Sequence, residues 1–86
     1  MTGPAQVYPN PAVDRVNIRF ATKATQDAEV RLYTMAGVLA TRVTGTVSTA
    51  QPMLTCDLNV APGVYLYWAK CGGRVDKGKV VVVKRN

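Results

Sequence analysis

The chain has 86 residues, of which 48% are hydrophobic, and it carries a formal net charge of +6 with no histidine. This length fits one domain, and the apolar content excludes a disordered chain. It lacks an apolar run of about 18 residues, so we expect no membrane span. It also lacks a basic start followed by an apolar stretch, so we expect no signal peptide. The protein is therefore expected to be either cytoplasmic or part of a longer exported chain.

The N-terminal part of the chain predicts one strand after an extended segment. Residues 7–12 include two prolines, which favour an extended stretch along a sheet edge or a simple leading loop. Residues 15–20 alternate in polarity, as in a half-buried antiparallel strand. The side chains expected to face inward are Val16, Ile18 and Phe20.

The middle of the chain predicts a hairpin and then a loop. After a polar loop at 21–26, residues 28–34 alternate again and predict a strand. Gly37 supplies the left-handed turn position, and residues 38–43 return as the partner strand. Residues 45–51 have the weakest pattern, so we expect a mobile loop there.

The two cysteines are expected to remain free. Residues 52–58 predict a short strand that turns near residue 60 and lies beside the strand at 63–71. In that arrangement Cys56 and Cys71 are offset by roughly 20 Å along the strands, whereas bridged Cα atoms lie within about 7 Å. Two thiols without a histidine also make a poor zinc site.

The stretch at 62–84 has the highest apolar density and predicts two long strands joined at Gly72-Gly73. These glycines supply the positive φ of a two-residue type I′ or II′ turn. With this turn, the strands pair in a register whose members are Tyr65 with Val80, Leu66 with Lys79, Tyr67 with Gly78, Trp68 with Lys77, and Cys71 with Arg74.

The two faces of this hairpin differ in chemistry. One carries Tyr65 and Tyr67 and is expected to face the core, with the Tyr67 ring covering the bare Gly78. The opposite face carries Trp68 and three lysines. Burying an unpaired lysine is costly, so this face is expected to be exposed. Its lysines are Lys70, Lys77 and Lys79.

Trp68, Lys70 and Lys77 have two interpretations. In the first, the three side chains form an exposed patch that binds a sugar, a lipid headgroup or a protein. Trp68 then makes a cation–π contact with Lys77. Alternatively, the tryptophan ring only covers the second face of the domain.

Together the segments predict an all-β fold with six strands, or seven if the proline-rich segment pairs at an edge. Turn signals recur about every 8 to 12 residues, which indicates an immunoglobulin-like antiparallel β-sandwich. A small barrel is the alternative.

The residues needed for catalysis are scarce. There is no histidine, Ser48 is the single serine, and the acidic residues are scattered, so neither general acid–base nor nucleophilic chemistry has its usual groups. No phosphate-binding glycine loop or calcium loop is present. We therefore expect no enzymatic activity and no cofactor, and a function that resides in a recognised surface.

The C-terminal part is strongly basic, with one acid, Asp76, among six basic residues: Lys70, Arg74, Lys77, Lys79, Lys84 and Arg85. Such a patch attracts nucleic acid, anionic lipid or an acidic protein surface, or simply keeps a small domain soluble. Because no nucleic-acid motif accompanies it, we expect no nucleic-acid partner.

Four motifs follow one another in an order that resembles a known family. They are Tyr8-Pro9-Asn10-Pro11-Ala12, Val30-Arg31-Leu32-Tyr33 with Gly37, Asp57-Leu58 with Gly63-Val64-Tyr65, and Gly78-Lys79-Val80-Val81-Val82-Val83-Lys84. Their order, spacing and extent resemble the C-terminal sorting domain of the type IX secretion system. On this resemblance, residues 1–6 form a linker and residues 7–86 the sorting domain.

The resemblance implies an immunoglobulin-like domain at the end of a protein exported by a Bacteroidetes-type bacterium. A cargo domain precedes the chain, crosses the periplasm and reaches the cell surface or the medium through the outer-membrane translocon. In many such proteins a sortase-like peptidase removes the domain and joins the cargo to an anionic lipopolysaccharide. The alternative function is an accessory immunoglobulin-like module that binds carbohydrate or a neighbouring domain.

Several residues match the family's pattern. Gly63 and Tyr65 match its Gly-x-Tyr motif, Gly37 matches its hairpin glycine, and Lys79 and Lys84 match the basic residues around its last strand. By contrast, Cys56, Cys71 and Trp68 are not part of that pattern.

The last strand is the expected recognition signal. If it lies at a sheet edge, it can pair with a receptor strand, and the residues expected to carry the signal are Lys79, Val81, Val83, Lys84 and Arg85. An exposed terminal strand also favours pairing between copies, so a homodimer through this edge is a further expectation.

Overall fold

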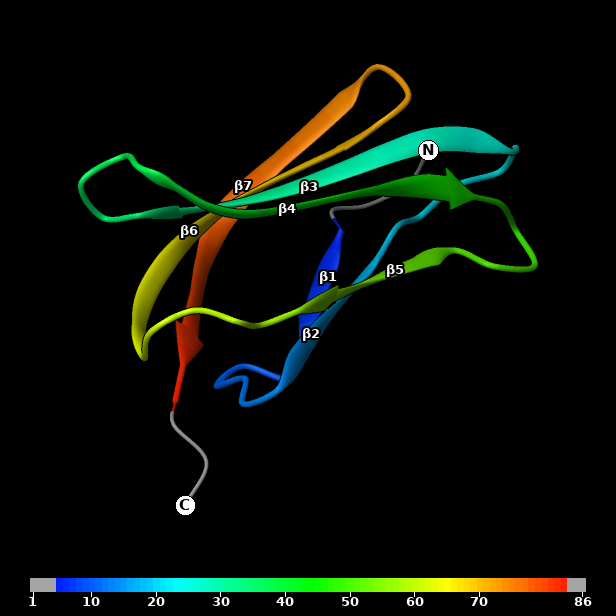
Figure 1. Cartoon of the computed structure of the whole chain (residues 1–86). Coiled ribbons are helices and arrows are strands. Elements are labelled where there is room, and N and C mark those ends of the chain that lie inside the picture. The colour runs from blue at the N-terminus through cyan, green and yellow to red at the C-terminus, as the bar shows by residue number, and fades with distance from the viewer. Residues whose placement is uncertain (1–4, 84–86) are drawn as a thin grey trace.

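The computed structural model describes residues 5–83, which form seven strands in two antiparallel sheets and contain no helix. One sheet has the order β1 (Gln6–Tyr8), β2 (Arg15–Arg19), β5 (Met53–Asp57). The other has the order β4 (Leu39–Val47), β3 (Gln26–Thr34), β6 (Gly63–Cys71), β7 (Arg74–Val82). The two sheets face each other (Figure 1). This confirms the predicted β-sandwich, with the proline-rich segment supplying the seventh strand at an edge.

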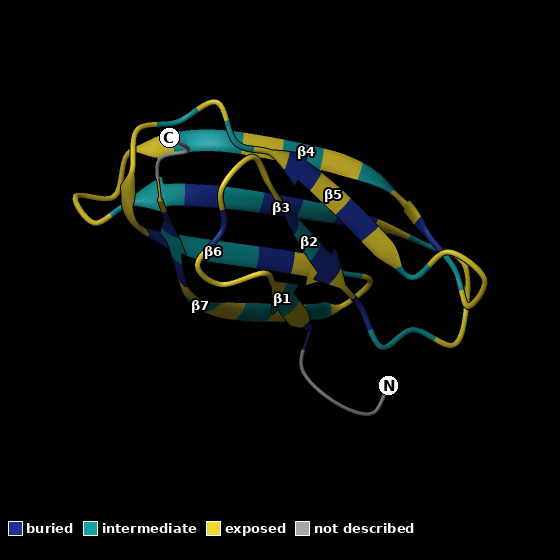
Figure 2. Ribbon diagram, turned by 90° about the horizontal axis from the view of Figure 1, so that it is seen from below, coloured by how far each residue is buried: buried dark blue, intermediate teal, exposed yellow. Residues whose placement is uncertain are grey.

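The core lies between the sheets and follows the predicted alternation. Inward and outward side chains alternate along β2 and β3, as the bands of buried residues in Figure 2 show. Apart from Cys56 and Tyr65, no buried side chain within residues 5–83 carries a polar or charged group. The largest side chains that are fully buried are Ile18, Leu32, Val16, Val30, Val47 and Val80. In the same range there is no helix that is long and apolar enough to cross a bilayer.

The β6–β7 hairpin has the predicted register, with Trp68 opposite Lys77 and Tyr67 opposite Gly78. Gly72 has a φ of 60°, whereas Gly73 does not have a positive φ, which is the pattern of a type II′ turn rather than type I′. A Cβ at Gly78 would lie 2.6 Å from two ring carbons and the hydroxyl oxygen of Tyr67. The ring therefore covers this glycine, as predicted.

Three predictions about segment boundaries and neighbours were wrong. Strand β4 extends to Val47, well into the predicted loop at 45–51, because Val47 continues the inward alternation and is fully buried. Gly45 interrupts the apolar pattern in the sequence. In the structure Leu54 of the facing sheet fills the space beside this glycine, since a Cβ there would lie 2.8 Å from its side chain. The segment at 7–12 lies at sheet edges, as predicted, but it is not extended throughout, because it is a strand only as far as Tyr8 and then bends.

The third error concerns β5, which belongs to the other sheet and is no neighbour of β6. The connection at 58–62 therefore crosses between the sheets instead of closing a hairpin. Cys56 and Cys71 are nevertheless free, as predicted, with Cys56 buried in the core and Cys71 partly buried. Burial raises the pKa of both thiols, which keeps them protonated and weakly nucleophilic near neutral pH.

Candidate recognition surface

The first and last motifs of the chain meet at the edge of the four-stranded sheet. Ala12, which is fully buried, forms a parallel bridge with Val82. The Ala12 N–H donates to the Val81 carbonyl at 2.7 Å, and the Val83 N–H donates to the Ala12 carbonyl at 2.8 Å. Residues 8–12 thus extend the sheet for a short distance beyond β7. We call residues 8–12 together with 79–83 the terminal junction.

Asn10 completes the terminal junction with its side chain. Its Oδ1 accepts the Val81 N–H at 3.0 Å, and its Nδ2 donates to the Lys79 carbonyl at 3.3 Å. The flanking prolines, Pro9 and Pro11, are exposed, so the bonded side chain lies between two residues that lack a backbone donor. An asparagine amide can supply both an acceptor and a donor to a strand edge, which gives the Pro-Asn-Pro motif a structural role.

Three of the five predicted signal residues lie in the terminal junction. Lys79 and Val83 are exposed, Val81 is half-buried, and the alternate residues Val80 and Val82 belong to the core. Strand β7 is an edge strand, the condition for pairing with a receptor strand, but its outward main-chain groups from the Lys79 carbonyl to the Val83 N–H are already bonded to the N-terminal segment. Lys84 and Arg85 lie outside the described residues.

The other motif residues shape the connections. Tyr8 ends β1, and its hydroxyl contacts the Met53 sulfur at 3.2 Å. Gly37 has a φ of 86° in the β3–β4 turn. Gly63 begins β6, and the hydroxyl of buried Tyr65 donates to the Ala61 carbonyl at 2.5 Å. The Gly-x-Tyr motif therefore ties the crossover between the sheets to the core.

Trp68 lies in the middle of the outward face of the four-stranded sheet and is half-buried. Its neighbours across the ladder are Arg31 on β3 and Lys77 on β7. The Arg31 guanidinium carbon lies 4.4 Å from the centre of the Trp68 ring, a cation–π geometry. The sequence suggested Lys77 for this contact, whereas the structure gives it to Arg31, whose planar guanidinium stacks on aromatic rings.

Glu29 holds two arginines over this face. Its Oε2 lies 2.6 Å from Arg31 Nε and 2.5 Å from Arg42 Nε. These hydrogen bonds, that of Arg42 first, lower the pKa of Glu29, so the carboxylate stays ionised at neutral pH. Lys70 and Lys77 on the same face are exposed, and neither has a carboxylate within salt-bridge distance among residues 5–83.

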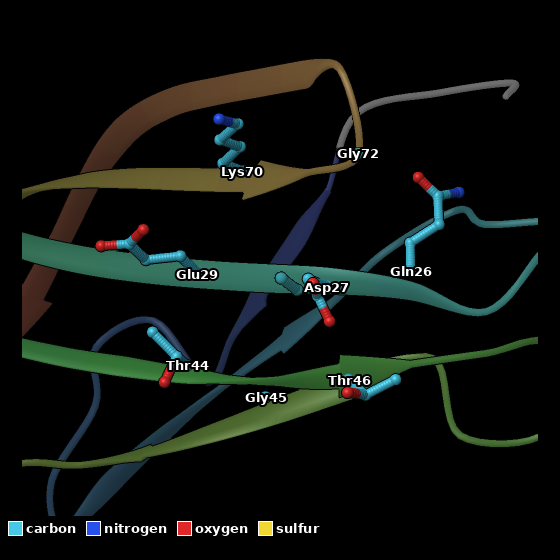
Figure 3. A pocket seen from close by; sticks show the side chains of 9 residues that line it. Gln26, Asp27, Glu29, Thr44, Gly45, Thr46, Lys70 and Gly72 are labelled. Carbon is cyan, nitrogen blue, oxygen red and sulfur yellow. The ribbon is translucent and has the colours of Figure 1, made fainter.

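A polar depression of about 650 Å³ lies over β3, β4 and the end of β6. Figure 3 shows Glu29 on β3 between Lys70 on β6 and Thr44 on β4. Two carboxylates line it, Asp27 and Glu29, and that of Glu29 is bonded to Arg31 and Arg42. Within residues 5–83 no hydrogen bond links either carboxylate to the hydroxyl of Thr44 or Thr46.

Two elements of this surface were not assigned from the sequence. The role of Asn10 depends on a contact between residues 71 positions apart, for which no local pattern exists. The role of Arg31 depends on which strand lies beside β6. The alternation of Arg31 and Tyr33 on β3 indicates that Arg31 faces outward. This was the one sequence signal that could have identified Arg31 as part of the surface.

A family model and two solved structures are similar to this chain. The family model described as a secretion system C-terminal sorting domain matches residues 6–84. No curated protein matches the chain. Two solved structures share its fold. The crystal structure of dimeric latent PorU from Porphyromonas gingivalis is 18% identical with a TM-score of 0.73, and the match covers 94% of this chain and 9% of PorU. CopC from Methylosinus trichosporium OB3b is 16% identical with a TM-score of 0.61, and the match covers 95% of this chain and 96% of CopC.

Proposed function

The chain belongs to the family of secretion system C-terminal sorting domains, and we propose that it directs a cargo through the type IX outer-membrane translocon as a folded, non-catalytic signal. The observation that carries this proposal is the terminal junction. Two motifs from opposite ends of the chain are held together there on one surface, which forms only in the folded domain.

The signal that we propose consists of side chains rather than of a free strand edge. The N-terminal segment already occupies the outward main-chain groups from the Lys79 carbonyl to the Val83 N–H. A translocon component that binds this region therefore contacts the outward side chains Lys79, Val81 and Val83, together with Lys84 and Arg85. The sorting domain would comprise residues 7–86, preceded by a linker at 1–6 and a cargo domain.

Later steps of export follow the family pattern. The cargo would pass through the periplasm, and a sortase-like peptidase would remove the sorting domain at or before Tyr8 and join the cargo to the cell surface. Retention of the domain on a secreted protein is the other outcome. Mass spectrometry of the exported cargo separates the two, because a cleaved cargo ends before the domain.

The proposal is tested with a folded reporter fused in front of this chain in a bacterium that has the type IX system. Removing residues 84–86 or introducing Lys79→Glu leaves the buried side chains of β7 in place. We expect either change to leave reporter in the periplasm. Lys23→Glu, in an exposed loop, is the matched charge control and should be exported normally.

Thermal unfolding of each variant separates loss of the signal from loss of the fold. Normal export of both the truncated and the Lys79→Glu fusions would contradict the proposed signal. An accessory binding module would instead leave even the unaltered fusion in the periplasm.

A further inference from the structure

The outer edge of β7 is covered along only part of its length. Both the N–H and the C=O of Val81 bond outward to the N-terminal segment. Because this direction repeats every second residue in an antiparallel ladder, Lys77 and Val75 also point their N–H and C=O groups away from β6. Within residues 5–83 no hydrogen bond to these four groups is formed from outside the strand. We call residues 75–79 the open edge.

The outward-facing charges of the open edge are the two lysines, whereas its one carboxylate, Asp76, is bonded to Arg74 and to the Ala5 N–H. Lys77 and Lys79 are exposed on the outward face of the sheet, and two residues on one strand face lie roughly 7 Å apart. Arg31, Arg42 and Arg74 each have a carboxylate partner. The two lysines have none within residues 5–83, so their charge is available to a partner.

We propose that the open edge docks an extended, acidic segment of a partner protein as an added strand. The main chain of the segment bonds to Val75 and Lys77, and its carboxylates lie opposite Lys77 and Lys79, since directly facing side chains on neighbouring strands interact. This inference goes beyond the proposed export role and rests on no step of it.

Other occupants fit the open edge less well. In a two-fold antiparallel pairing of two copies centred at Lys77, this lysine faces its own equivalent, and facing like charges are destabilising. Lysine on an edge strand is also a common means of preventing such self-pairing. A polyanion without peptide groups matches the lysines but leaves the four main-chain groups unpaired.

The test uses the whole 86-residue chain and an end-blocked heptapeptide in which valine alternates with glutamate. Binding is followed by the emission of Trp68, the single tryptophan, which lies opposite Lys77 in the ladder. Backbone amide shifts locate the contact. We expect the largest shifts at Val75 and Lys77. A peptide with lysine in place of glutamate should not bind, nor should one with N-methyl groups along the pairing edge.

Two sets of variants separate the main-chain and charge contributions. Val75→Pro removes an outward N–H while leaving the bonds to β6, as proline on an edge strand does, and we expect it to abolish binding, whereas Val75→Thr binds normally. Lys77→Glu with Lys79→Glu should weaken binding by about tenfold or more, because two attractive pairs become repulsive. Arg19→Glu with Lys23→Glu changes the net charge equally at exposed sites elsewhere and should have little effect.

Each of the following results would overturn the proposal. The glutamate peptide does not bind; the N-methylated peptide or the folded Val75→Pro variant binds as well as its control; or both double charge variants weaken binding equally, which indicates general attraction of polyanions. Concentration-dependent shifts at Val75 and Lys77 without peptide would assign the open edge to a second copy of the chain. The N-methylated peptide keeps the test decisive if Val75→Pro does not fold.

Discussion

Replacing Asn10 with alanine tests whether the terminal junction stabilises the domain. The substitution removes the bonds from Val81 N–H to Oδ1 at 3.0 Å and from Nδ2 to the Lys79 carbonyl at 3.3 Å. Asn10 is exposed, so each bond contributes a net stability near the lower part of the usual range, about 0.5 to 1 kcal/mol. We therefore expect the free energy of unfolding to fall by about 1 to 2 kcal/mol. In a domain of this size, this lowers Tm by roughly 5 to 15 °C.

Urea unfolding measures the stability change, and hydrogen exchange of the Val81 amide shows where it arises. The Val81 amide should exchange faster in the Asn10→Ala variant, because its acceptor is gone. Asn10→Asp keeps the acceptor but loses the donor to Lys79, and should fall between the wild type and alanine at neutral pH. Asn59→Ala, at an exposed position between β5 and β6, is the control. A change in unfolding free energy below about 0.5 kcal/mol, the usual range for neutral surface positions, with unaltered exchange at Val81, would contradict a stabilising role for the terminal junction.

Two further predictions concern the four-stranded sheet. Gly78→Ala should destabilise the domain by about 1 to 3 kcal/mol because its Cβ would overlap the Tyr67 ring; in a double-mutant cycle with Tyr67→Ala the two effects should be strongly non-additive, and simple additivity would argue against the contact. The hydrogen bonds from Arg42 and Arg31 lower the pKa of Glu29. Its contribution to the free energy of unfolding is therefore complete above the ordinary glutamate pKa of about 4.3, and it is lost as the pH falls through the lowered pKa of the folded state. Glu29→Gln should thus be less stable than wild type at pH 7, with the difference closing in acid; a difference that does not vary with pH in a urea-unfolding series would count against the ion pairs.

The strands of this fold are predictable because their alternation is local. The β6–β7 register follows from one tight turn and from the pairing of Tyr67 with Gly78, all within a single hairpin. The far end of β4 was missed because Gly45 interrupts the apolar pattern, although the strand needs no side chain there when Leu54 fills the space.

Contacts between distant segments could not be predicted in the same way. Sequence spacing does not state which sheet a strand joins, so β5 was placed beside β6 and the partner of Trp68 was assigned to its own hairpin. The β3–β6 pairing that brings Arg31 to the ring, and the bonds from Asn10 to β7, arise only when the sandwich closes. The motif residues could be named from sequence, but their physical roles required the assembled sheets.

The location of a folded reporter that carries this chain at its C-terminus tests the sorting role most directly. In a bacterium with the type IX translocon, we expect the reporter to reach the outer face of the cell, where added protease digests it on intact cells. In the same strain without the translocon, the reporter should stay protected in the periplasm. A reporter with a correctly folded tail that remains in the periplasm of both strains would contradict the sorting role.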